Sequence, residues 1–169
     1  QGNGVIIGFI DTGIRYELYV FRKEDGSTRI VSIWDQTIQT GTPPEGFAYG
    51  TEYRRADINR ALAVDDPLSV VPTTDTIGHG TQMASAAAGS LLDQGLTFRG
   101  AAPQADIAVV KLKGDKQYLR DYYLIADDAE AYQENDIMEA VKYIQQMAVP
   151  FSKPVVIVLG IGTHMGSHD

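Results

Sequence analysis

Three short apolar runs constrain the fold of this chain more than any other feature. Residues 5–10, 105–112 and 155–159 are each almost continuously apolar and of strand length. This pattern is typical of strands that are covered on both faces. Residues 29–34 alternate more loosely and predict a further strand. Because helical segments separate these runs, the sequence predicts an α/β fold, a mostly parallel sheet flanked by helices with right-handed crossovers.

The helical segments differ in character. Small residues dominate 79–92, which predicts a helix packed close to its neighbours. Asp136 and Glu139 form a capping-box pattern at the start of an amphipathic helix, which two prolines end. A short surface helix is expected over 51–63, whereas 113–133 has no clear pattern.

Composition restricts the classes of partner. The chain has 169 residues, 44% of them hydrophobic and 21% charged, enough for one domain with a real core. Its formal net charge is -8 and it has no basic stretch, so we expect no nucleic-acid partner and no membrane partner. The absence of cysteine excludes disulfides and thiolate metal sites.

Two residues point to hydrolytic chemistry. Asp11 comes where the first apolar run ends, and ligands of parallel sheets bind beyond the carboxyl ends of strands. His79 opens the small-residue helix between Gly78 and Gly80, which we interpret as positions of close approach. In a hydrolytic triad, an imidazole takes the proton of a nucleophilic hydroxyl, and a buried carboxylate holds that imidazole in its tautomer. Asp11 and His79 are therefore candidates for two of the three members.

Each residue also has a plainer interpretation. Asp-Thr-Gly is good turn chemistry, and a histidine can simply cap a buried helix. Asp-Thr-Gly is also a motif of aspartic peptidases, but those enzymes need two carboxylates that share a proton. This chain has one such motif and several helical segments, so we favour the pairing of Asp11 with His79.

Together the two motifs resemble those of the subtilisin-like serine peptidases, the subtilase family. Residues 7–14 match its apolar strand followed by Asp-Thr/Ser-Gly, and residues 79–85 match its His-Gly-Thr-His-Val-Ala-Gly. Residues 100–111 are similar to its Gly-Val-Ala-Pro segment and the following strand. Residues 155–162 are similar to the strand ending in Ser-Leu-Gly that flanks the substrate cleft.

The resemblance implies roles for five residues. Asp11 would orient and stabilise the imidazole, and His79 would act as general base and later as general acid. Gly160, Ile161 and Gly162 would form one wall of the primary specificity pocket and hold extended peptide through backbone groups.

Three positions depart from the family pattern. Gln82 and Ser85 replace the usual histidine and glycine of the helix motif, and Gly160 replaces the usual serine of the pocket wall. We expect the first two to alter packing and the third to alter pocket shape. The segments 33–36 and 132–137 most resemble subtilases of clostridia-like anaerobes, including the spore-germination type.

The nucleophile of the triad is not recognisable. In this family the oxyanion-hole asparagine and the serine of Gly-Thr-Ser follow the cleft-wall strand, and the sequence stops at Asp169 before either. We expect residues 1–169 to be the N-terminal portion of a single subtilisin-like peptidase domain, inactive alone. Its partners would be a protein or peptide substrate and the C-terminal part of the same domain. An exposed sheet edge would also favour self-association.

Two alternatives remain open. A pseudoprotease would keep the fold but bind a partner instead of hydrolysing peptides. In a purely structural module both motifs would be coincidental. Asp11 and His79 lie 68 positions apart, so we expect an insertion within 20–75 that lines or caps the cleft.

No cofactor is expected, although two acidic or histidine-containing groups are candidate metal ligands. Asp65, Asp66 and Asp75 could join a calcium site, which subtilases often carry. The second group lies near the end of the sequence and consists of His164, His168 and Asp169. Its spacing could bind a metal, but a solvated chain end is the simpler interpretation. Four tyrosines are expected in the core or at the cleft rim: Tyr118, Tyr122, Tyr123 and Tyr132.

Overall fold

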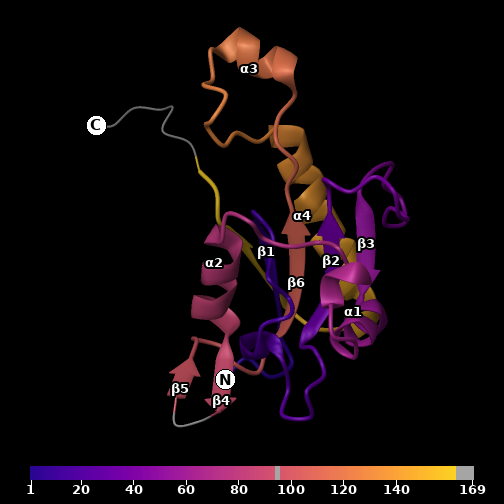
Figure 1. Ribbon diagram of the computed structural model, residues 1–169, viewed down its shortest axis with the longest axis vertical. Helices are drawn as coiled ribbons and strands as arrows, with labels where there is room; N and C mark the ends of the chain where they lie inside the picture. The colour runs from indigo at the N-terminus through magenta and orange to yellow at the C-terminus, as the bar shows by residue number, and fades with distance from the viewer. Residues whose placement is uncertain (94–95, 163–169) are drawn as a thin grey trace.

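A five-stranded sheet forms the centre of the molecule (Figure 1). The computed structural model describes residues 1–93 and 96–162, without the side chains of 91–93 and 96–97. The strand order is β3-β2-β6-β1-β7, and every neighbouring pair is parallel except β2 with β3. The bounds are β1 Ile6–Asp11, β2 Ile30–Asp35, β3 Thr51–Arg54, β6 Asp106–Lys111 and β7 Val155–Leu159.

Helices lie on both faces of this sheet and beyond its edge. They are α1 (Arg55–Leu62), α2 (His79–Ala88), α3 (Gln117–Tyr123) and α4 (Glu134–Ala148). In Figure 1, α2 and α4 lie on opposite sides of the sheet, and α3 stands away from it beyond the carboxyl end of β6. A separate antiparallel pair, β4 (Ser90–Asp93) and β5 (Leu96–Arg99), follows α2. No helix of the described residues is both long and apolar enough to cross a membrane.

The alternation of side chains along β1 builds two cores. Ile7 and Phe9 pack with Ala84 of α2 and Ile58 of α1 in one buried cluster. The alternate residues of β1, Ile6 and Ile10, pack in a second cluster against α4, because successive side chains of a strand point to opposite faces. A strand buried on both faces must be apolar throughout, which explains the first apolar run.

The predicted α/β architecture with a mostly parallel sheet is confirmed, and four strands lie where the three apolar runs and the alternating segment 29–34 placed them. Three details of the prediction were wrong. The segment 51–63 begins as a strand, because residues 51–54 pair with the edge of β2 before α1 starts. The helix expected over 79–92 ends at Ala88, and residues 90–93 form β4. Helix α4 begins at Glu134 and has no side-chain cap.

Candidate active site

Asp11 and His79 meet at the carboxyl ends of the parallel strands. The Nδ1 atom of His79 lies 2.8 Å from Oδ1 of Asp11. Asp11 is 1% exposed, whereas the side chain of His79 is 48% exposed. Because an ionised carboxylate only accepts hydrogen bonds, Nδ1 carries the proton in this contact and Nε2 is left as the basic nitrogen. A buried anion that orients a half-exposed imidazole is the arrangement that a general base requires.

The electrostatic surroundings favour the protonated form of this imidazole. The hydrogen bond to Asp11 and the charge of Asp11 raise the pKa of His79 above its ordinary value. Slight burial opposes the shift, and the charges of Glu130 and Asp75 add to it. A neutral, basic His79 is therefore available only at higher pH than for an isolated histidine.

A second carboxylate, Asp75, fixes the two halves of the site to each other. One of its oxygens accepts from the hydroxyl of Thr12 at 2.9 Å and from the amide of Gly78 at 2.8 Å. Its other oxygen accepts from the amide of Thr81 at 2.9 Å and from the hydroxyl of Thr81 at 2.6 Å. Burial opposes ionisation, but these four hydrogen bonds outweigh it and hold the pKa of Asp75 below its usual value.

The helix that carries His79 also touches the strand end directly. The amide of Gly80 donates to the Thr12 hydroxyl at 2.9 Å. A Cβ atom at Gly80 would lie 2.3 Å from the carbonyl oxygen of Gly13, so the close approach predicted for Gly80 is confirmed. The same prediction for Gly78 was wrong. Space is open around Gly78, and glycine is favoured there by a φ of 91° at the helix N-cap.

The predicted pocket-wall residues lie in different surroundings. Gly160 contacts the Asp11–His79 pair, since a Cβ built on it would lie 1.7 Å from Oδ2 of Asp11 and 3.5 Å from Cε1 of His79. Its amide donates to the Ile10 carbonyl at 3.1 Å. Ile161 packs against the α4-side core, and Gly162 is exposed with open space around it. Their role in substrate binding stays a prediction.

A cavity of about 280 Å³ lies beside the pair. Thr12 and Ile77, the neighbours of the two motifs, form one side of it, and residues from 111–132 form the other. Of the segment 20–75, which we expected to line or cap the cleft, only Thr37 lines this cavity, and the segment carries β2, β3 and α1.

The four tyrosines considered for the core or the cleft rim differ in their surroundings. Tyr132 is half-buried and lines the cavity, as expected for a cleft rim. For the other three the core placement was wrong, because they lie on α3 and are 60% to 77% exposed, and they do not line this cavity: Tyr118, Tyr122 and Tyr123.

No group of three or more histidine, aspartate or glutamate side chains within 1–93 and 96–162 could hold a metal ion. Asp75 uses both oxygens for hydrogen bonds, and Asp65 and Asp66 are exposed, so the calcium site considered for these three does not fit. His164 and His168, with Asp169, lie outside the described residues.

The positioning roles of Asp75 and Thr12 were not predicted from the sequence. Asp75 stands four residues before His79, directly ahead of a predicted helix start, where aspartate commonly caps backbone amides. That position was a usable signal. No local sequence pattern indicated that Glu130 lies near the site, because its position depends on how 113–133 folds back towards the sheet.

Comparison with known proteins gives the family. The model of the subtilase family matches residues 2–140. This chain belongs to the subtilase family. The subtilisin-like protease SBT3.6 of Arabidopsis thaliana is 31% identical over 161 residues, covering 83% of this chain. The subtilisin-like protease SBT3 of Solanum lycopersicum is 31% identical over 122 residues, covering 65% of the chain.

A solved structure agrees in fold. The CspB protease of Clostridium perfringens superposes with a TM-score of 0.78 and 30% sequence identity over 99% of this subtilase chain. This agreement is consistent with the resemblance of the chain to clostridial subtilases. The chain spans 30% of the CspB chain, 19% of SBT3.6 and 16% of the tomato protease.

Proposed function

We propose that this chain is the N-terminal portion of a serine endopeptidase domain that hydrolyses peptide bonds through an Asp-His-Ser triad. The observation that carries the proposal is the 2.8 Å contact between a buried Asp11 and a half-exposed His79 at the carboxyl edge of a parallel sheet. Family membership supports a peptidase in general, because the matched relatives are named proteases.

In this mechanism Asp11 holds the Nδ1–H tautomer, so that Nε2 of His79 faces the reacting groups as a base. His79 removes the proton of the serine hydroxyl as the serine attacks the peptide carbonyl, and then donates that proton to the leaving amine. Asp11 stabilises the imidazolium that forms between these steps. The serine and the oxyanion-hole donor would come from sequence beyond Asp169, and residues 1–169 alone would be inactive.

Labelling with a fluorophosphonate probe tests the proposal in the full-length protein. The probe reacts only with an activated serine, so we expect the wild type to be labelled and the His79→Ala variant to lose labelling. Gln82→Ala is the matched control, because Gln82 is exposed on the same helix. It should label like the wild type.

Two outcomes would contradict the peptidase. One is undiminished labelling and peptide hydrolysis by His79→Ala. The other is no labelling of a folded wild-type protein, which would favour the pseudoprotease alternative, with Asp11 and His79 as remnants of a lost site.

A further inference from the structure

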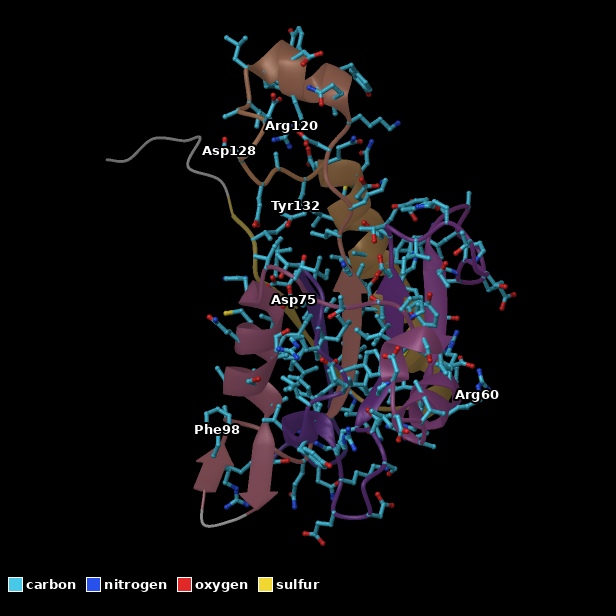
Figure 2. The ribbon with its side chains drawn as sticks, viewed as in Figure 1. Arg60, Asp75, Phe98, Arg120, Asp128 and Tyr132 are labelled. Carbon is cyan, nitrogen blue, oxygen red and sulfur yellow. The ribbon has the colours of Figure 1, made fainter. Side chains whose placement is uncertain are left out.

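The cavity beside the Asp11–His79 pair is closed on one side by an arch, residues 113–133, that stands above the sheet edge. Arg120 holds the arch in shape. Its guanidinium pairs with Asp115 at 2.8 Å and donates to the carbonyls of Ala126 and Ala129, each at 2.6 Å. Figure 2 shows Arg120 and Asp128 on the arch, with Tyr132 at the base of the arch, towards Asp75.

The charged groups that line this cavity are not equally available to a ligand. Lys111 donates to the Thr74 carbonyl at 2.7 Å and lies 4.0 Å from the buried carboxylate of Asp35. Arg120 is committed to Asp115 and two carbonyls. Glu130 is exposed, and its carboxylate accepts a long hydrogen bond of 3.4 Å from the Tyr132 hydroxyl. Its carboxylate therefore retains most of its capacity to accept hydrogen bonds.

Carboxylates act on the hydroxyl of Tyr132, which lines the cavity. Burial, followed by the charge of Glu130 and its hydrogen bond, raises the pKa of Tyr132 to about 12, and the charges of Asp11 and Asp75 contribute to the same shift. The charge of Glu130 also reaches His79 on the other side of the site. A cation in the cavity would meet the exposed carboxylate of Glu130 in the lining, with the buried carboxylates of Asp11 and Asp75 behind it.

We propose that this cavity receives a lysine or arginine side chain of the peptide substrate, with Glu130 as its counter-ion. The inference rests on the proposed peptidase function and specifies its substrate class. Ile77, Leu112 and Ala131 give the lining apolar surface for the methylene stem of such a side chain. Thr12 follows Asp11 and Ile77 stands two residues before His79, so the cavity lies near the pair and suits a side chain close to the scissile bond.

The test compares matched peptides that carry lysine or the uncharged norleucine at each of the four positions before the scissile bond. It uses the full-length protein, and the readout is the ratio of kcat/KM for the two peptides. At one position we expect lysine to be preferred by about fivefold, the size of a partly exposed ion pair. Glu130→Gln should bring this ratio close to one. A ratio cancels any effect of Glu130 on His79, since both peptides use the same imidazole.

Asp128→Asn is the matched control, because Asp128 is an exposed carboxylate of the same arch that does not line the cavity. It removes the same charge and should keep the wild-type ratio. Hydrolysis with no lysine preference, or a preference equally reduced in both variants, would overturn this inference and leave the peptidase standing. A wild type that neither reacts with the fluorophosphonate nor hydrolyses any peptide would overturn both.

Discussion

Replacing Asp75 with alanine removes four hydrogen bonds, one from Thr12 just after β1 and three from Gly78 and Thr81 at the start of α2. At about 1 kcal/mol net for each hydrogen bond, the expected loss in the free energy of unfolding is about 4 kcal/mol. Each oxygen of Asp75 accepts two of these bonds. Asparagine keeps one carbonyl oxygen and so two of the bonds, and Asp75→Asn should therefore lower the free energy of unfolding by about 2 kcal/mol.

The assay is equilibrium urea unfolding at pH 7, followed by the fluorescence of the buried Trp34. Asp65→Ala serves as control, because Asp65 is an exposed aspartate in the irregular segment before the site, and its replacement should change stability by less than about 0.5 kcal/mol. If Asp75→Ala and Asp65→Ala were equally stable, the hydrogen-bond reasoning would be refuted. Since the lowered pKa of Asp75 favours the folded state above its unfolded pKa, this contribution should also disappear as the pH falls through the folded value.

Two further predictions concern the Asp11–His79 pair. Because the pKa of His79 is raised and the base must be neutral, kcat/KM should fall on the acid side at a pH above the ordinary histidine value. Asp11→Asn should move that limb to lower pH, and a profile that did not move would contradict the assigned cause. Gly160→Ala should lower the free energy of unfolding by about 1–3 kcal/mol, because its methyl group would overlap Oδ2 of Asp11. Gly162→Ala, with open space around it, is the control, and equal melting temperatures for the two variants would argue against the overlap.

Apolar periodicity predicted the strands well, because burial on both faces leaves few other sequences for a central strand. It failed where tertiary contacts outweigh local pattern. Asp136 was interpreted as a helix cap from its spacing to Glu139. In the structure it is buried and accepts from the Tyr49 hydroxyl at 2.8 Å, a contact 87 positions away that no local pattern records.

The residues of the candidate site likewise fall into those predictable from local motifs and those placed by tertiary contacts. Asp11 and His79 were predictable because strand ends and helix starts are local features with strong motifs. The strand pattern also put Gly160 at the same carboxyl edge as Asp11. Its proximity to Oδ2 of Asp11 depends on the direct pairing of β7 with β1, which the pattern did not predict. The arch that carries Glu130 was unpredictable, since 113–133 is positioned by carbonyl contacts of Arg120 rather than by apolar burial.

The hydrogen bonds of the Thr12 hydroxyl bear on the order in which the catalytic site would assemble. It donates to Asp75 and accepts from Gly80, so a single side chain binds both the loop before α2 and the helix itself to the strand end. These bonds, like the contact of Asp11 with His79, join residues within 11–81. A nucleophile supplied from elsewhere in the protein would therefore meet a base already set in orientation, and the entropic cost of aligning it would have been met during folding.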